Sequence, residues 1–259
     1  MAIKNIVLGA DNIASYVKAT KQPVNAMLIT TKRCPATLVI DVSGSMIPYQ
    51  SLLKKITCEL YQDILKDPVA KNIVELSIIN FSSDVGIVQP LCEISSQEKQ
   101  GADLEFQCGG LTLTGSALQA ALLQLEQRID QYRHSVPVIR HTAPLLFLVS
   151  DGKPEYTPEM KDDEEKAMAW SKNYIKEHVR TNKLSVIAVE IGNSCNHALM
   201  RELTGLSNDH HVLRVDNGTA LADLFRFSSS LMVTCSRYQE MGEQLNEKDL
   251  RDYQHLEEL

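Results

Sequence analysis

A chain of 259 residues can hold one large α/β domain or two smaller ones, and a hydrophobic content of 44 % provides for a sizeable core. The net charge of -7 argues against a nucleic-acid or membrane-surface protein. Much of this charge is local, because residues 238–259 contain seven acidic and two basic side chains and so carry a charge of -5. The body of the chain is therefore nearly neutral.

The six cysteines form no C-x-x-C pair and show no zinc-ligand spacing with histidine. Most of them lie in or beside apolar runs, which predicts buried, reduced thiols. The amino terminus lacks the cleavage site of a signal peptide, and no segment approaches the length of a membrane span. These features predict a cytoplasmic protein.

Residues 1–34 precede the first strongly apolar strand of the chain. Residues 3–8 and 23–30 could each form a strand, and a polar stretch over 11–22 lies between them. We expect these residues to form an amino-terminal extension that packs on the domain.

The next predicted strand, over residues 37–41, is a short apolar run of the kind that is buried on both faces of a parallel sheet. Apolar residues then recur at helical spacing over 52–64, which predicts a helix that covers one face of the sheet. Residues 72–81 predict a second strand, and residues 85–94 a third that runs antiparallel to it. Pro90 favours the edge of the sheet for this third strand.

A polar loop is predicted over 95–107. After it, three further strands are predicted, over 145–149, 184–191 and 212–215. Helices alternate with them: one from Gly115, one that starts near 162–165, a short one over 197–203 and a long one after 217–219. Trp170, Tyr174 and His178 recur at four-residue spacing on the helix that starts near 162–165. We interpret this stripe as core packing rather than as a ligand pocket.

The alternation of strands and helices predicts an α/β fold, with one doubly wound, mostly parallel central sheet, helices on both faces and one antiparallel edge strand. In such folds, ligands bind beyond the carboxyl ends of the strands, near the point where the strand order reverses. Asp41 and Asp151 both follow predicted strands directly. The fold therefore predicts a site that contains both aspartates.

Three oxygen-bearing residues, Asp41, Ser43 and Ser45, alternate along the loop that ends the first buried strand. Hard oxygen ligands that converge on one point suit a small divalent cation better than they suit a nucleophile. A serine hydrolase would need a base beside one of the serines, and the sequence places no histidine there. A G-x-S-x-G elbow and a Walker A loop are also absent from the sequence.

The stretch Asp41-Val42-Ser43-Gly44-Ser45 resembles the D-x-S-x-S signature of von Willebrand factor A domains, which opens their metal-ion-dependent adhesion site. Residues 109–115 and 146–152 are similar to the other two metal loops of that family and follow in the same order. The resemblance covers roughly residues 37–236. It implies the Rossmann-like fold that the pattern of elements also predicts.

The resemblance implies a metal site made of Asp41, Ser43, Ser45, Thr112 and Asp151. Ser43 and Ser45 would coordinate the cation directly, and Thr112 would supply a hydroxyl in some states. The two aspartates would act mainly through water or hydrogen bonds. The family more commonly has the sequence Gly-Gly-Thr-x-Thr-Gly in the second loop, and here Leu111 is inserted before Thr112. Thr114 therefore stays an alternative for the threonine of this loop.

The expected cofactor is Mg²⁺, or Mn²⁺ or Ca²⁺. Magnesium prefers six oxygens and keeps several waters. Because neutral hydroxyls are the direct protein ligands, the ion would retain positive charge and attract a glutamate or aspartate of a partner protein. The resemblance thus implies a protein-interaction module that is not an enzyme.

Three segments are expected: an extension over 1–34, a von Willebrand factor A domain over 35–236, and an acidic tail over 237–259 that is helical or disordered. The stretch Asp151-Gly152-Lys153-Pro154 is similar to one in stand-alone bacterial proteins of tellurium-resistance and stress-response clusters. The alternative function is a magnesium-dependent phosphate-handling enzyme that uses Asp41 and Asp151.

Overall fold

The computed structural model describes residues 9–24, 32–97, 104–151, 153–191, 195–209 and 211–215. In these ranges six strands form one sheet in the order β3-β2-β1-β4-β5-β6. The strands are β1 (Cys34–Asp41), β2 (Val74–Phe81), β3 (Val85–Glu93), β4 (Leu145–Ser150), β5 (Ser185–Ile191) and β6 (Val212–Val215). All neighbouring strands are parallel except β3, which runs antiparallel to β2 at the edge. The predicted fold class is confirmed.

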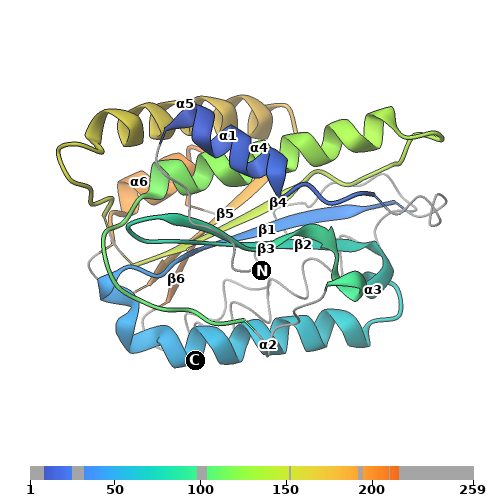
Figure 1. Ribbon diagram of the computed structural model, residues 1–259, viewed down its shortest axis with the longest axis horizontal. Coiled ribbons are helices and arrows are strands. Elements are labelled where there is room, and N and C mark those ends of the chain that lie inside the picture. Colours follow the sequence, from blue (N-terminus) through green and yellow to red (C-terminus); the bar gives the residue numbers. More distant parts are fainter. Residues whose placement is uncertain are drawn as a thin grey trace.

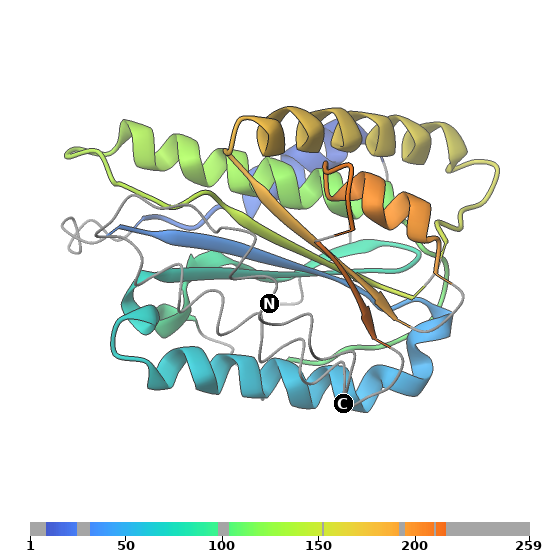
Figure 2. The ribbon, with the colours of Figure 1, turned by 180° about the vertical axis from the view of Figure 1, so that it is seen from behind.

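Helices cover both faces of this sheet, as Figures 1 and 2 show. The helices are α1 (Ala10–Ala19), α2 (Gln50–Lys66), α3 (Ala70–Ile73), α4 (Thr114–His134), α5 (Lys161–Arg180) and α6 (His197–Leu203), with 3₁₀ turns η2 (Gly44–Tyr49) and η3 (Ile94–Ser96). In both views α1, α4, α5 and α6 lie on one side of the sheet, and α2 and α3 lie on the other. The chain therefore has three layers, with the sheet in the middle.

The central strand β1 is buried along its whole length. Leu38 and Ile40 pack in the cluster that includes α2, whereas Val39 packs in the opposite cluster with α4. Successive residues of a strand point to opposite faces, so a strand covered on both sides is apolar at every position. This burial is the reason why the apolar run predicted β1 correctly.

The structure differs from the predictions in the amino-terminal segment. Helix α1 occupies the stretch that was expected only to be polar, because Ile13 and Val17, four residues apart, give it a narrow apolar stripe that is buried on the sheet side. Pro48 lies inside the 3₁₀ turn η2, and α2 begins only at Gln50. The aromatic stripe on α5 packs against the core as expected. The rings of Tyr174 and His178 are stacked, with their centroids 3.8 Å apart.

Several predicted segments lie outside the described residues: the strand over 3–8, most of the strand over 23–30, the long helix after 217–219 and the tail over 237–259. The division into three segments therefore stays a prediction. The five cysteines in the described ranges are free, as predicted, but only Cys34 is buried and the other four are half-buried, so the predicted burial is wrong for most of them. Among the described helices, none combines the length and the apolar character needed to cross a membrane.

The amino ends of the strands hold a buried group of charged side chains. Glu75 of β2 forms ion pairs with Arg128 of α4 and, at 3.8 Å, with Arg33, and it accepts a hydrogen bond from the Tyr132 hydroxyl at 2.6 Å. Arg33 also pairs with Glu93 at 2.6 Å. Two arginines and two glutamates thus balance one another in the interior, as buried charges require.

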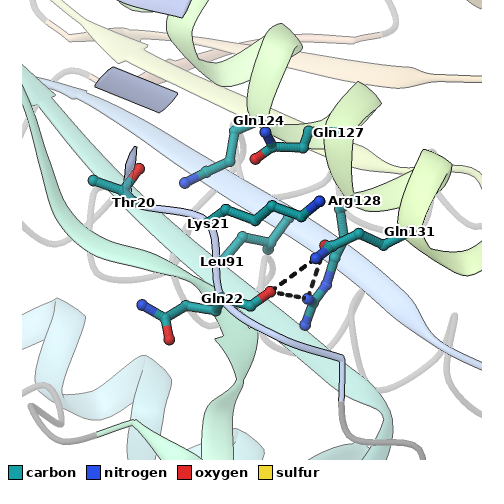
Figure 3. Close-up of a pocket in the computed structure, with 8 residues that line it drawn as sticks. All are labelled: Thr20, Lys21, Gln22, Leu91, Gln124, Gln127, Arg128 and Gln131. Atoms are coloured by element: carbon teal, nitrogen blue, oxygen red, sulfur yellow. Dashed lines mark hydrogen bonds between the residues drawn. The ribbon is translucent and has the colours of Figure 1, made fainter. Parts of the chain in front are cut away.

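A small pocket lies beside this charged group, and Figure 3 shows its lining. The Gln22 carbonyl accepts hydrogen bonds from Arg128 at 2.9 Å and from Gln131 at 3.0 Å, which ties the chain after α1 to α4. The cavity volume is about 10 Å³, close to what one water molecule needs. This pocket is therefore too small for an organic ligand.

Candidate metal centre

The site is built at the carboxyl ends of β1 and β4. These two strands are neighbours, and the strand order reverses between them, because β2 and β3 lie beyond β1 while β5 and β6 lie beyond β4. Asp41 is the last residue of β1, and Ser150 is the last residue of β4. The structure thus brings the first and third predicted loops together at the reversal point, where open α/β sheets bind ligands.

Asp41 is fully buried, and both of its carboxylate oxygens accept hydrogen bonds. The backbone N–H of Ser43 donates to Oδ1 at 2.8 Å, and the Ser150 hydroxyl donates to Oδ2 at 2.7 Å. The first bond shapes the loop after β1, and the second fixes the end of β4 to the end of β1. Asp41 therefore organises the site from within the protein.

A chain of side-chain contacts continues from Ser43 across the site. The Ser43 and Ser45 hydroxyl oxygens lie 3.1 Å apart, and the Ser45 hydroxyl donates to Asp151 Oδ1 at 2.7 Å. Four of the five predicted residues are thus joined by hydrogen bonds, either to one another or through Ser150. The sequence reasoning gave Ser150 no role; its hydroxyl position immediately before Asp151 was the available signal.

The second loop is held against the first through the backbone. The N–H of Gly109 donates to the Val42 carbonyl at 2.7 Å, and the N–H of Gly44 donates to the Gly110 carbonyl at 3.2 Å. Gly110 has a φ of +84°, and a Cβ on it would lie 2.3 Å from the Ser83 hydroxyl oxygen. Only glycine fits this position, which explains the second glycine of the pair at the start of the loop.

Thr112 lies between the second and third loops. Its N–H donates to the Glu155 carbonyl at 2.9 Å, and its carbonyl accepts from the Glu155 N–H at 3.0 Å. The Thr112 side chain is buried, and so is that of Thr114, the first residue of α4. The backbone places Thr112 in the loop next to Ser43 and Ser45, and the choice between the two threonines stays a prediction.

Burial raises the pKa of Asp41, and the nearby charge of Asp151 raises it further, whereas the hydrogen bonds from Ser150 and Ser43 lower it. Burial also raises the pKa of Asp151, and the bond from Ser45 lowers it. Two partly desolvated carboxylates that repel each other are stabilised by a cation between them. The electrostatics of the site therefore fit a bound cation.

Two thiols, Cys108 and Cys195, lie near the site but do not suit it as ligands. Burial, together with the charges of Asp41 and Asp151, raises the pKa of Cys108 to about 11. Burial and the charge of Glu190 raise the pKa of Cys195 to about 12, and its thiol lies 3.8 Å from the Ser150 carbonyl oxygen. Both thiols stay protonated at neutral pH, and the thiolate is the form that binds metals.

The donor set consists of hydroxyl and carboxylate oxygens. In the described part of the chain, no group of three or more histidine, cysteine, aspartate and glutamate side chains is arranged to hold a metal. A cation at this position would therefore depend on the serine and threonine hydroxyls. Such hard oxygens suit Mg²⁺, Mn²⁺ or Ca²⁺.

Solved structures of several extracellular and bacterial proteins share the fold. The pilus adhesin SpaC from Lactobacillus rhamnosus GG matches with a TM-score of 0.56 and 15% identity, over 79% of this chain and 30% of that one. A von Willebrand factor type A protein from Catenulispora acidiphila matches with a TM-score of 0.54 and 16% identity, over 78% and 43% of the two chains. The manganese-loaded TRAP protein of Plasmodium vivax matches with a TM-score of 0.50 and 19% identity, over 74% and 71%.

Proximal thread matrix protein 1 from the mussel byssus also matches, with a TM-score of 0.52 and 15% identity over 79% of this chain and 48% of that one. This chain spans less than half the length of that protein, of SpaC and of the Catenulispora protein. No curated protein matches. The model of the von Willebrand factor type A domain, however, matches residues 37–227, which is well over half of the sequence. The chain therefore belongs to the von Willebrand factor type A domain family.

Proposed function

We propose that this chain is a metal-dependent protein-interaction module. Ser43, Ser45 and Thr112 would hold a divalent cation through their hydroxyls, and Asp41 and Asp151 would support it through hydrogen bonds or water. The observation that carries the proposal is the pair of serine hydroxyl oxygens 3.1 Å apart. Two buried aspartates hydrogen-bond to this pair of residues at the point where the strand order of the sheet reverses. The expected ion is Mg²⁺, with Mn²⁺ or Ca²⁺ as alternatives.

The partner would supply a glutamate or aspartate to the cation. Asp41 already accepts two hydrogen bonds from protein groups, so its charge is directed inward and the cation keeps positive charge on its open side. Manganese in the TRAP protein of Plasmodium vivax supports a metal in this fold. Adhesion by the pilus protein SpaC supports a role in binding other proteins.

An apolar contact beside the cation would add to this recognition. Ile47 is 58% exposed and lies in η2, two residues after Ser45, whereas the neighbouring Met46 is fully buried. A single exposed apolar side chain is ordinary on a protein surface, so it is the position of Ile47, two residues after Ser45, that suggests a contact with the partner. We therefore expect a partner that presents an apolar side chain next to its acidic residue.

An enzymatic role is not part of the proposal. A phosphate-handling enzyme would use Asp41 as a nucleophile, but both oxygens of that carboxylate accept hydrogen bonds and the residue is fully buried. On the similarity of residues 151–154 to a stretch in bacterial tellurium-resistance and stress-response proteins, we propose that the module acts in a cytoplasmic system of that kind. Turnover of p-nitrophenyl phosphate, measured with magnesium, is expected to stay at background.

The decisive test is metal binding by calorimetry with Mg²⁺, Mn²⁺ and Ca²⁺ on the full chain. We expect one site in the wild-type protein and none in the double variant Ser43→Ala/Ser45→Ala. The matched control is Ser96→Ala, because Ser96 lies on η3, outside the three loops, and donates to the Glu93 carbonyl at 2.8 Å. Wild-type protein without a metal site, or a double variant that binds as well as wild type, would show that the proposal is wrong.

A further inference from the structure

The first turn of α4 is capped by a carboxylate from another helix. Glu164, on the first turn of α5, is 2% exposed. Its Oε1 accepts from the Ser116 N–H at 2.6 Å, and its Oε2 accepts from the Gly115 N–H at 3.1 Å. The first N–H groups of a helix have no partner within that helix, so this one side chain satisfies two of them in the interior.

The backbones of α4 and α5 must lie very close for this contact to form. A Cβ on Gly115 would lie 2.7 Å from the Glu164 carbonyl oxygen and 2.8 Å from the Met168 N–H nitrogen. These are backbone atoms, which cannot move aside as a flexible side chain can. Glycine at this position therefore permits the approach that brings the Glu164 carboxylate to the start of α4.

The second loop is thus tied at two points to the segment that follows Asp151. Thr112 pairs with Glu155 through two backbone hydrogen bonds, and the turn just after Thr112 is held by Glu164. The helix N-terminus also carries a partial positive charge, which would repel a cation bound nearby. The carboxylate of Glu164 offsets that charge.

We propose that Glu164 is a positioning residue for the candidate metal centre. It acts through the first turn of α4, where it fixes the place of the Thr112 loop against the third loop and neutralises the positive end of the helix. This inference rests on the proposed metal site. It adds a residue that lies outside the three metal loops, on the helix that follows the third loop, and it links cation binding to the packing of α5 on α4.

The test compares Glu164→Gln with Ile175→Val. Glutamine keeps one carbonyl acceptor but loses the charge and one of the two hydrogen-bond acceptors. Ile175 is a buried residue of the same helix that packs in the apolar cluster, so its variant loosens α5 without touching the α4 turn. Two quantities are measured: the Kd for Mn²⁺ by calorimetry, and hydrogen exchange at the Gly115 and Ser116 amides without metal.

For Glu164→Gln we expect a Kd about 10-fold weaker, the scale of losses when groups behind metal ligands are changed, and faster exchange at Gly115 and Ser116. For Ile175→Val we expect a lower Tm with a Kd within about 2-fold of wild type. If wild-type protein binds Mn²⁺ and Glu164→Gln binds it equally well, the positioning role is wrong while the proposed function stands. If wild-type protein binds no metal, both are wrong.

Discussion

The Ser45 hydroxyl donates a hydrogen bond to Asp151 Oδ1 at 2.7 Å, across 106 residues of sequence. A hydroxyl in this position can give a lone pair to a cation while its O–H continues to donate to the aspartate. Ser150 makes the reciprocal link by donating to Asp41 Oδ2 at 2.7 Å. The two strand ends are thus joined in both directions by hydrogen bonds that hold the serine oxygens in place.

Asp41→Asn is expected to abolish the stabilisation that a divalent cation gives. The amide can still accept from the Ser43 N–H, but it presents an NH₂ group or a neutral oxygen to Ser150 and removes the charge behind the cation. For wild type, a metal at 100 times its Kd should add about 2.7 kcal/mol to the free energy of unfolding. Thermal unfolding with Mg²⁺ and with chelator measures this difference, and an unchanged metal response in Asp41→Asn would contradict the role of Asp41.

The same variant should change how stability depends on pH when no metal is present. Burial raises the pKa of Asp41, so the folded state favours the protonated carboxyl. This contribution is fully present below the unfolded pKa of about 3.9 and is lost as the pH rises through the higher folded pKa. Wild type should therefore lose stability relative to Asp41→Asn as the pH rises through this window.

Urea unfolding in chelator at a series of pH values from acid to neutral measures this difference. The burial of Asp151 should produce the same trend in both proteins, because its pKa is raised too and the variant retains it. A wild-type protein that gains stability relative to Asp41→Asn as the pH rises would mean that the Asp41 charge is favoured in the fold, in contradiction to the assignment.

The strands and the three loops could be predicted from the sequence because each has a local signal. The buried strand over 145–149 is apolar at every position, and Asp41, Ser43 and Ser45 alternate in one short stretch. Helix α1 was missed because only Ile13 and Val17 mark its buried side. Its packing against the sheet, rather than its composition, stabilises it as a helix.

The contacts that support the site could not be predicted from the sequence, although the hydroxyl residue just before Asp151 was a signal for Ser150. Ser150 meets Asp41 across 109 residues, and Glu164 meets the Ser116 amide across 48 residues. An acidic residue in the first turn of a helix is common, because it complements the helix dipole of its own helix. Nothing in the sequence distinguishes a glutamate that caps a neighbouring helix, so only the packing of α4 against α5 reveals its contact.

Ile47→Lys is expected to weaken partner capture more than it weakens metal binding. The side chain is 58% exposed, so the free energy of unfolding should change by no more than about 0.5 kcal/mol. The positive charge would also lie beside the cation and reduce the apolar contact with the partner. Chelator-sensitive capture of a partner, followed by calorimetry with Mg²⁺, separates the two effects.

Val69→Lys is the matched control, because Val69 is 40% exposed and follows α2 at the far end of that helix from the metal loops. It should leave both measurements unchanged. Capture by Ile47→Lys at the level of Val69→Lys would exclude Ile47 from the binding surface.

Gly115→Ala is expected to lower the free energy of unfolding by about 1–3 kcal/mol, the usual cost of overpacking a close contact. Its Cβ would lie 2.7 Å and 2.8 Å from backbone atoms of α5, so one helix must move away from the other. Gly44→Ala is the control, because the added Cβ would meet only the Gly110 carbonyl at 3.7 Å, an ordinary contact. Urea unfolding of both variants should show the larger loss for Gly115→Ala; equal losses would mean that α4 and α5 tolerate a wider spacing.

Glu75→Gln is expected to cost about 3 kcal/mol of the free energy of unfolding, because it leaves buried arginine charge without its partner. Glu75 is fully buried and contacts Arg33, Arg128 and Tyr132 at the amino ends of the strands. Glutamine has nearly the same volume as glutamate, so the decrease in the free energy of unfolding reflects the missing charge rather than a change in packing. The metal response should stay intact, because this group lies at the opposite end of the strands from Asp41, as the pairing of Asp41 with the last residue of β2 shows.

The control for this charge is Glu105→Gln, because the Glu105 side chain is 76% exposed and lies 3.9 Å from Lys54. An exposed pair of this kind contributes little to stability, so its loss should change the free energy of unfolding by less than about 1 kcal/mol. Urea unfolding of the two variants measures the difference directly. If the Glu75→Gln protein were as stable as Glu105→Gln, solvent would have to reach the two arginines. The buried charged group at the amino ends of the strands would then be more hydrated than its packing indicates.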